Sequence, residues 1–316
     1  MKQFSEARVI VNPIAGAGKT GRQWPDIKAL LEKNGLCISY DLTEAPGHAT
    51  DLAIKAAEMG YELIISVGGD GTTNEIVNGL YQAGSTNNTI LGIVPTGTGR
   101  DYARTVGIPR HWRDACTCLT NPRKCVVDLG LVEYTNSGQA MKRVFVNFAG
   151  LGFDAEIVKA TTQRFKSLGG IPSYLMGLLT TVLSYRNQEL SLTMDGQTED
   201  RKSCVVLLCN GKYGGGGMFA APQANLGDGL LDMVMIDELS KPELLWSLPR
   251  IYKGTHLSHP KVTARQVTDI EIRPKQHIAL QADGELLGEA PAHFSVVPSA
   301  LNIAVQCSDQ TVSCPR

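Results

Sequence analysis

The sequence predicts an α/β protein with two domains: an N-terminal domain built on a parallel sheet, and a C-terminal domain that is mainly β. Up to about residue 128, continuous apolar runs alternate with segments of helical periodicity, as in parallel strands covered on both faces by helices. Beyond that point strand-like runs dominate, separated by turn signals such as Asp195-Gly196 and Asp283-Gly284. The 316 residues, 43% of them hydrophobic, are enough for two packed cores.

The first part contains four short apolar runs of strand length, each followed by a segment whose apolar residues recur every three to four positions. We expect strands at residues 8–11, 37–42, 63–67 and 90–94. We expect helices at residues 21–33, 49–59, 73–81, 100–105 and 112–119. This alternation predicts a parallel sheet with helices on both faces.

The second part consists of strand-like runs interrupted twice by helical patterns. We expect strands at residues 126–132, 144–148, 190–194, 205–209, 231–236, 267–272, 278–282 and 294–305. The helical patterns are at residues 155–185 and 241–252. The expected domains are residues 1–128 and 129–307, followed by a polar, frayed tail at residues 308–316.

Charge and cysteine content restrict the classes of protein. Lys and Arg total 30 and Asp and Glu total 31, so the chain lacks the basic excess typical of nucleic-acid-binding proteins, and no nucleic-acid partner is expected. The N-terminus lacks the apolar core of a signal peptide, and the eight cysteines form no Cys-x-x-Cys pair. We therefore expect a cytoplasmic protein with free thiols.

The first glycine-rich segment, residues 12–21, follows a strand and opens a helix. It does not form a P-loop, because Pro13 occupies the place of the first glycine. The pattern Gly16-x-Gly18-x-x-Gly21 fits a dinucleotide fingerprint with Asp41 as the ribose acid, yet residues 150–155 fit the same pattern by chance. Both interpretations share one prediction, which is that bare N–H groups at this helix N-terminus favour an anion.

Two further glycine-rich turns follow apolar strands, at residues 68–72 and 95–101. Three glycines surround Asp70, and they allow backbone amides to approach phosphate oxygens. Thr72-x-x-Glu75 also fits a helix capping box. Because the carboxyl ends of parallel strands share one edge of a sheet, the three turns together predict a nucleotide-phosphate site.

In combination, these motifs resemble the diacylglycerol kinase catalytic domain family, which includes bacterial soluble lipid kinases, sphingosine kinases and ceramide kinases. The matching residues lie in the family's order along nearly the whole chain: Asn12-Pro13 with Gly16, Gly68-Gly69-Asp70-Gly71-Thr72-x-Asn74-Glu75, Thr96-Gly97-Thr98-x-x-Asp101, Gly150-x-Gly152-x-Asp154, Gly214–Gly217 with Ala221-Pro222, Asp228-Gly229-x-Leu231-Asp232, and Asp283-Gly284-Glu285.

The resemblance implies that ATP binds to the N-terminal domain and that the active site lies in a cleft between the two domains. The residues it assigns to the nucleotide are Asn12, Pro13, Ile14, Ala15, Gly16, Thr43, Gly68, Gly69, Asp70, Gly71, Thr72, Thr73, Asn74, Glu75, Thr96, Gly97 and Thr98. It assigns Mg²⁺ and its waters near the phosphates to Asp70, Asp101 and Asp128.

For the second domain, the resemblance assigns the catalytic base to Asp283, with Glu285 close by. A carboxylate there suits general-base chemistry, although Asp-Gly is also common turn chemistry. The resemblance further implies a structural Mg²⁺ site at the Asp228 turn, formed by this carboxylate with neighbouring Asn225 and Leu230.

The chain departs from the family pattern at two places. Arg100 stands where relatives often have Asn, and we expect it to contact a phosphate or a headgroup. Residue 227, often polar in relatives, is Gly227, which bears on the structural metal site.

Two segments bear on the substrate. Residues 100–124 carry six cationic and two acidic side chains, a balance of +4 that suits either an anionic membrane surface or solvated helix faces. The uncharged run at residues 167–185 is too polar for a membrane span and is expected to pack in a core or to line a lipid entrance.

The function implied is an ATP-dependent lipid kinase of phospholipid biosynthesis, with diacylglycerol as expected acceptor and phosphatidic acid as product. Its partners would be the lipid and the inner face of the membrane, contacted peripherally. A small-molecule kinase of the NAD kinase type and a catalytically silent lipid-binding relative are the alternatives. Pocket shape rather than motif decides the acceptor, and an oligomer is compatible with the sequence.

Overall fold

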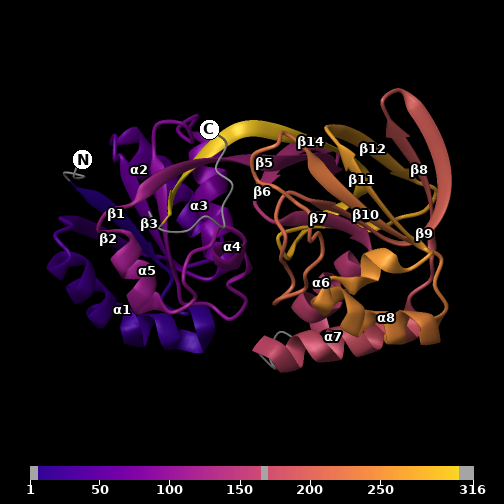
Figure 1. The fold of residues 1–316 in the computed structure, drawn as a ribbon, viewed down its shortest axis with the longest axis horizontal. Helices are drawn as coiled ribbons and strands as arrows, with labels where there is room; N and C mark the ends of the chain where they lie inside the picture. Colours follow the sequence, from indigo (N-terminus) through magenta and orange to yellow (C-terminus); the bar gives the residue numbers. More distant parts are fainter. Residues whose placement is uncertain (1–5, 165–169, 306–316) are drawn as a thin grey trace. The chain divides into compact units, whose positions relative to one another are not determined.

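A computed structural model describes residues 6–164 and 170–305 (Figure 1). The chain divides into two compact units. Unit 1 comprises the described residues up to Leu129, Leu226–Asp228, and the described residues from Pro298 on; unit 2 comprises Gly130–Asn225 and Gly229–Val297. The expected tail at residues 308–316 lies outside the described residues.

Unit 1 contains the expected parallel sheet, with strand order β2-β1-β3-β4 and the last part of β14 beside β4. Its strands are β1 (Ala7–Val11), β2 (Ile38–Leu42), β3 (Leu63–Gly68) and β4 (Ile90–Pro95), with β14 (Glu285–Val305). Its helices are α1 (Ala15–Lys33), α2 (His48–Glu58), α3 (Asp70–Gln82), α4 (Asp101–Thr105) and α5 (Trp112–Cys118).

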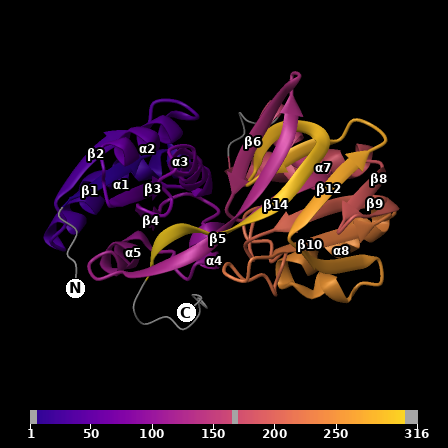
Figure 2. The same ribbon diagram turned by 90° about the horizontal axis from the view of Figure 1, so that it is seen from above.

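Helices cover both faces of this sheet (Figures 1 and 2). Trp24 and Leu31 of α1 and Trp112 of α5 belong to one buried cluster with alternate strand residues such as Val9 and Ile65. On the opposite face the Ser66 hydroxyl lies 3.0 Å from the Thr73 hydroxyl of α3. The near-continuous burial of β3 follows from this two-sided cover.

Strand register aligns the carboxyl ends of the four strands. Val11 pairs in register with Leu42 on one side and Val67 on the other, and Val67 pairs with Val94. The next residue of each strand therefore lies at one edge of the sheet, where the chain turns towards a helix. The three glycine-rich turns of the sequence are brought together by this register.

Unit 2 is mainly β, and its pairings are antiparallel. Among the described strands, β9-β7-β13-β14-β12-β8 pair in a closed ring around a buried core that includes Leu208, Leu280 and Phe294; β10 and β11 extend from β9, and β5 joins β6 to β14. The strands are β5 (Arg123–Asn136), β6 (Gln139–Phe145), β7 (Phe148–Gly152), β8 (Gln188–Met194), β9 (Gln197–Cys209), β10 (Leu231–Asp237), β11 (Val262–Val267), β12 (Asp269–Pro274) and β13 (Ala279–Ala282).

The helices of unit 2 lie together against one face of its sheet (Figure 1). They are α6 (Phe153–Arg164), α7 (Gly170–Ser184) and α8 (Lys241–Lys253), followed by the short η2 (Thr255–Ser258). Ile157 of α6, Val182 of α7 and Leu244 of α8 share a buried cluster with Val205 and Val234 of the strands. A capping box at Ser240 fixes the start of α8. No helix among the described residues is long and apolar enough to cross a membrane.

Several expectations are corrected by the structure. The single strands expected at 144–148 and 267–272 are each divided between two strands, and the helix expected at 155–185 comprises α6 and α7, separated by residues outside the described part. Residues 298–305, expected in the second domain, belong to unit 1 because the end of β14 pairs with β4.

One expected free thiol is also corrected. Cys125 is disulfide-bonded, whereas the other described cysteines are free. Sequence spacing does not show which cysteines meet in the fold.

Gly79 tests the packing of α3 on α2. A Cβ at this position would lie 2.4 Å from the carbonyl oxygen of Thr50 and 2.8 Å from Cβ of Ala53, so the two helices would have to separate. We expect Gly79→Ala to lower the free energy of unfolding by about 1–3 kcal/mol, as overpacked sites do. Gly71→Ala in the same helix, where a Cβ meets nothing within 4 Å, is the control and should not lower the melting temperature. Equal melting temperatures for both variants would contradict this packing.

Candidate active site

The candidate site begins where α1 opens, directly after β1. Gly16, Ala17 and Gly18 all have left-handed backbone conformations, with φ of 59°, 56° and 76°. A Cβ at Gly16 would lie 2.7 Å from the carbonyl oxygen of Thr96, so glycine is required there for conformation and for space. The Thr20 hydroxyl lies 2.7 Å from that of Thr96 and ties this turn to the one after β4.

The turns after β3 and β4 are in direct backbone contact. A Cβ on Gly97 would lie 2.4 Å from Cα of Gly69, so only glycine fits at position 97. The carbonyl oxygen of Gly68 accepts hydrogen bonds from the backbone N–H groups of Thr96 and Gly97, at 2.8 and 3.0 Å. The two turns therefore form one rigid backbone platform.

This platform exposes backbone and buries side chains. Gly69 and Asp70 are partly exposed and Gly71 is exposed, at the first turn of α3, where N–H groups without helical partners favour an anion. Ile14 is 75% exposed, and Thr98 is also at the surface. A ligand at this edge could reach these residues.

The polar residues that follow Gly71 make hydrogen bonds within unit 1, and their contacts with a nucleotide stay a prediction. The Thr72 hydroxyl accepts a hydrogen bond from Asn12 Nδ2 at 3.0 Å, so it joins the first turn to the second rather than capping α3. Asn74 is fully buried, and its Oδ1 accepts a hydrogen bond from Asn78. The predicted capping box is wrong: the N-cap of α3 is Gly69, and no side chain caps it.

Glu75 caps a different helix. Its carboxylate accepts hydrogen bonds from the backbone N–H groups of Gly47 and Ala49, at 3.0 and 3.1 Å, at the start of α2. A carboxylate at a helix N-terminus is stabilising because it satisfies free donors and opposes the helix dipole. Thr43, also predicted to contact the nucleotide, continues β2 at the same sheet edge through its N–H bond to the Val11 carbonyl.

Asp70 and Asp101 are the carboxylates that the fold brings together at this edge. A Cβ at Gly99 would lie 2.7 Å from Asp70 Oδ2 and 3.5 Å from Asp101 Oδ2, so both side chains flank this glycine. Asp70 Oδ1 accepts the backbone N–H of Tyr102, which orients the carboxylate. Mg²⁺ is typically bound by one or two carboxylates together with substrate phosphates, and this pair fits that requirement.

Asp128 does not complete a three-carboxylate cluster. Its Oδ1 accepts the backbone N–H of Ser299 at 2.6 Å, which ties β5 to β14 within unit 1. Within residues 6–164 and 170–305, no three His, Cys, Asp or Glu side chains gather to hold a metal. The expected structural site at Asn225, Asp228 and Leu230 depends on one carboxylate and on carbonyl oxygens, and it stays a prediction.

Two charged residues with expected ligand contacts bond to groups within unit 1, and those ligand contacts stay predictions. The Arg100 guanidinium donates to the carbonyl oxygens of Gly97 and Arg110, at 2.8 and 2.7 Å, and thus braces the turn after β4. Asp41, the candidate ribose acid, accepts a hydrogen bond from Arg8 Nε at 2.7 Å. The dinucleotide interpretation requires the Asp41 carboxylate to bind a ribose, whereas in the structure this carboxylate is paired with Arg8.

In unit 2, backbone amides fix the carboxylate of Asp283. Its Oδ1 accepts hydrogen bonds from the N–H groups of Asn147 and Phe148, at 2.9 and 3.1 Å, and its Oδ2 accepts that of Val146 at 2.7 Å. These three bonds hold the carboxylate in one orientation.

Asp283 also occupies the left-handed position of the two-residue turn between β13 and β14, with φ of 47°, followed by Gly284 with φ of 82°. Glu285 forms an ion pair with Arg143, with 2.5 Å between Nη2 and Oε2. No local sequence pattern marks Arg143, which is 142 positions away from its partner.

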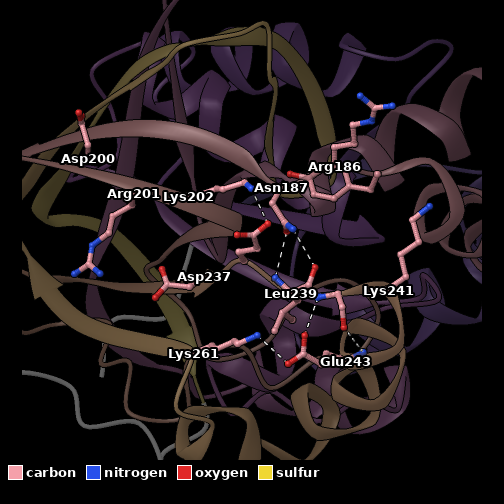
Figure 3. A pocket seen from close by; sticks show the side chains of 13 residues that line it. Arg186, Asn187, Asp200, Arg201, Lys202, Asp237, Leu239, Lys241, Glu243 and Lys261 are labelled. Atoms are coloured by element: carbon pink, nitrogen blue, oxygen red, sulfur yellow. Dashed lines mark hydrogen bonds and ion pairs between the residues drawn. The ribbon is translucent and has the colours of Figure 1, made fainter.

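A cavity of about 960 Å³ in unit 2 contains none of these residues (Figure 3). Charged side chains line it, and several are paired with each other: Lys202 Nζ lies 2.7 Å from Glu238, and Lys261 Nζ lies 2.8 Å from Glu243. Asn187 bonds to the backbone of Leu239 on its wall. The cavity is therefore an ion-paired surface hollow, and it does not contain the motif chemistry.

Comparisons with known proteins identify the family. A family model described as "Diacylglycerol kinase catalytic domain" matches residues 6–132, and one described as "YegS C-terminal NAD kinase beta sandwich-like domain" matches residues 147–305. A diacylglycerol kinase of Staphylococcus haemolyticus (strain JCSC1435) is 31% identical over 288 residues, covering 91% of this chain and 84% of that protein. One of Staphylococcus aureus (strain bovine RF122 / ET3-1) is 30% identical, covering 91% and 88%.

Solved structures share the fold. A crystal structure of a diacylglycerol kinase from Bacillus anthracis str. Sterne has a TM-score of 0.73 at 21% identity and covers 98% of this chain and 99% of that one. Yeast NADH kinase complexed with NADH has a TM-score of 0.55 at 12% identity, covering 98% and 86%. The chain belongs to the diacylglycerol kinase family and is a kinase, which confirms the resemblance drawn from its motifs.

Gly71 tests the placement of the phosphate site. A Cβ there meets nothing within 4 Å, so a larger side chain occupies only the space into which a phosphate would approach. We expect the ATP affinity measured by calorimetry to fall from wild type to Gly71→Ala and again to Gly71→Val. The melting temperatures should be unchanged. Equal ATP affinity for Gly71→Val and wild type would contradict this placement.

Proposed function

We propose that this protein transfers the γ-phosphoryl group of Mg-ATP to the hydroxyl of diacylglycerol, giving phosphatidic acid. One observation carries the proposal: the edge of the unit 1 sheet presents accessible backbone amides beside the paired carboxylates of Asp70 and Asp101, in a chain of the diacylglycerol kinase family. Phosphoryl transfer depends chiefly on positioning and on stabilisation of charge, and these are what such an edge supplies.

Each group at the edge has a role in this proposal. The amides of the first turns of α1 and α3 would bind phosphate oxygens, because N–H groups at helix N-termini attract anions. Asp70 and Asp101 would hold Mg²⁺, which when bound neutralises the negative charge of the phosphates. The Gly69–Gly97 contact would keep these groups in place during the reaction.

For the proton of the lipid hydroxyl we propose Asp283 as the acceptor. Its carboxylate is fixed by three amides, so it would not need to reorganise as the oxygen attacks phosphorus. Glu285 is the second candidate, and its carboxylate is engaged in an ion pair with Arg143. The proposal requires Asp283 to act both as a turn residue and as a base.

The acceptor is tested by supplying diacylglycerol in mixed micelles with γ-labelled Mg-ATP. We expect the label in chloroform-extractable product, because a lipid phosphate partitions into the organic phase. Label found only in water-soluble product, with NAD as acceptor, would instead support the NAD kinase alternative suggested by the shared fold. Label in neither product would support a catalytically silent relative.

The Asp283→Asn variant distinguishes a role of Asp283 as catalytic base from a role as turn residue only. Loss of general-base assistance should lower kcat by about 10²–10⁴, while KM for ATP stays unchanged. The amide cannot accept all three backbone bonds, so the melting temperature should also fall, in contrast to what a turn role alone predicts.

Asp195→Asn is the matched control, because Asp195 and Gly196 form an equivalent turn, with φ of 51° and 74°. This control should retain wild-type kcat. A near-normal kcat for Asp283→Asn would remove Asp283 as the base and move the assignment to Glu285.

We further propose that unit 2 contacts a membrane peripherally through α7 and α8. Leu179 and Leu183 on α7 and Leu245 and Trp246 on α8 are exposed, with Leu183 at 71% and Trp246 at 83%. Arg186 and Lys241 adjoin them, and cations beside apolar side chains favour anionic lipid surfaces.

Vesicle flotation tests the membrane contact. With anionic phospholipid vesicles, Leu183→Ser and Trp246→Ser should reduce the bound fraction. Met59→Ser, at an exposed apolar residue of unit 1, should not. Equal loss of binding for all three variants would contradict this surface.

A further inference from the structure

Asp154 lies at the first turn of α6, where no role in phosphoryl transfer has been assigned to it. Its Oδ2 accepts a 2.7 Å hydrogen bond from Nε2 of Gln281, a residue of β13 that is 1% exposed. Its Oδ1 is shielded from solvent, although the residue keeps some exposed surface. A carboxylate removed from water needs a strong reason to be retained, because its desolvation is costly.

The glycines of the Gly150-x-Gly152-x-Asp154 motif make room for this carboxylate. Gly150 faces Gln281 across the β7–β13 pairing, and a Cβ there would lie 2.0 Å from Asp154 Oδ2. Gly152, with φ of 96°, leaves space for the Tyr185 hydroxyl, which bonds to the backbone of Cys204. The motif is thus explained by the side chains that it accommodates.

Gln281 connects Asp154 to the turn that contains Asp283. Its Oε1 accepts the backbone N–H of Gly284 at 2.9 Å, while its Nε2 donates to Asp154. Asp283 is thereby held from two sides: the amides of Val146, Asn147 and Phe148 hold its carboxylate, and the Gln281 side chain holds its turn.

The direction of these hydrogen bonds depends on the charge of Asp154. An ionised carboxylate only accepts, so it fixes the Gln281 amide with Nε2 towards Asp154 and Oε1 towards Gly284. A protonated carboxyl can donate to Oε1 instead, which would turn the Nε2 donor towards the Gly284 donor. Two donors facing each other cannot bond, and the turn would lose its support.

We propose that Asp154 is a positioning residue that, through Gln281, holds the Asp283-Gly284 turn in place only when its carboxyl is ionised. This inference rests on the proposed function in so far as Asp283 is the base. The hydrogen-bond chain itself belongs to unit 2 whatever the reaction is.

The burial of Asp154 brings its pKa into the pH range in which enzyme activity can be assayed. Removal from water raises its pKa from 3.8 to about 6, and the hydrogen bond from Gln281 opposes this rise only in part. The titratable groups that interact with it are Tyr185 after α7 and Cys204 and Cys209 of β9. Asp232 of β10 in turn acts on Cys209, and Glu156 of α6, which pairs with Lys159, acts on Tyr185. Burial raises the pKa of Cys204 to about 12 and also raises the pKa of Tyr185 well above its ordinary value. Both groups therefore stay neutral near pH 6.

Stability and activity should then change in opposite directions with pH. Because the folded-state pKa of Asp154 lies above its ordinary value of 3.8, its contribution to stability is largest below about pH 4 and is lost as the pH rises through about 6. Activity should rise over the same range, since ionisation supports the turn. If Asp154 were important only for folding, activity and stability would change in the same direction with pH.

Kinetics of wild type and Asp154→Asn between pH 5 and pH 8 test the inference. With a pKa of about 6, about one-tenth of Asp154 is ionised at pH 5 and nearly all at pH 8, so wild-type kcat should rise about 10-fold at constant KM for ATP. An Asn amide can face Gln281 either way, so Asp154→Asn should stay near the wild-type value at pH 5 across the range. Gln281→Leu should do the same, and the double variant should add nothing.

An NMR titration of ¹⁵N-glycine-labelled protein tests the same chain without any assay of activity. The Gly284 amide resonance should shift with a midpoint near pH 6 in wild type and should not titrate in Asp154→Asn. A Gly284 amide that is insensitive to pH, or that titrates identically in both proteins, would overturn the inference. If the protein phosphorylates no diacylglycerol, the proposed function fails, and the Gly284 titration still decides the positioning role.

Discussion

The close approach of Gly69 and Gly97 is the constraint on which the candidate site depends. A Cβ on Gly97 would lie 2.4 Å from Cα of Gly69, so the turns after β3 and β4 are in contact only because Gly97 lacks a side chain. Their contact leaves the amides at the start of α3 exposed and brings the carboxylates of Asp70 and Asp101 to either side of Gly99. Phosphate binding and metal binding, as proposed, would both depend on this backbone geometry.

Unit 2 uses a different device for its candidate base. Three amides at the start of β7 hold the Asp283 carboxylate, and the same strand leaves space at Gly150 for Asp154. β7 and β13 therefore support the turn from both its side chain and its backbone. A buried polar network of this kind is stabilising only when every member has a partner.

Periodicity and turn chemistry predict most of the fold. The parallel sheet follows from apolar runs with helices between them, and the left-handed turns at residues 195–196 and 283–284 follow from Asp-Gly. The first part of β6, residues 139–143, does not follow from the sequence pattern, because it is mostly exposed and lacks an apolar face. The pairing of β14 with β4 could not be predicted, since it joins segments more than 200 residues apart.

The candidate site is less accessible to prediction than the fold. The glycine clusters mark the phosphate edge, but they do not reveal that Thr72 and Glu75 serve other parts of unit 1. Gln281 carries no signal of its own, because its role depends on partners at positions 154 and 284 that only the folded chain brings together.

Amide hydrogen exchange with and without Mg-ATP tests the central claim, that the edge of the unit 1 sheet is the phosphate site. Exchange should slow at the amides of residues 16–17, 69–72 and 98–99, which would bind phosphate oxygens. The strands of unit 1 should be unaffected because their amides are already bonded. Protection confined to other segments, or none at saturating Mg-ATP, would contradict the account.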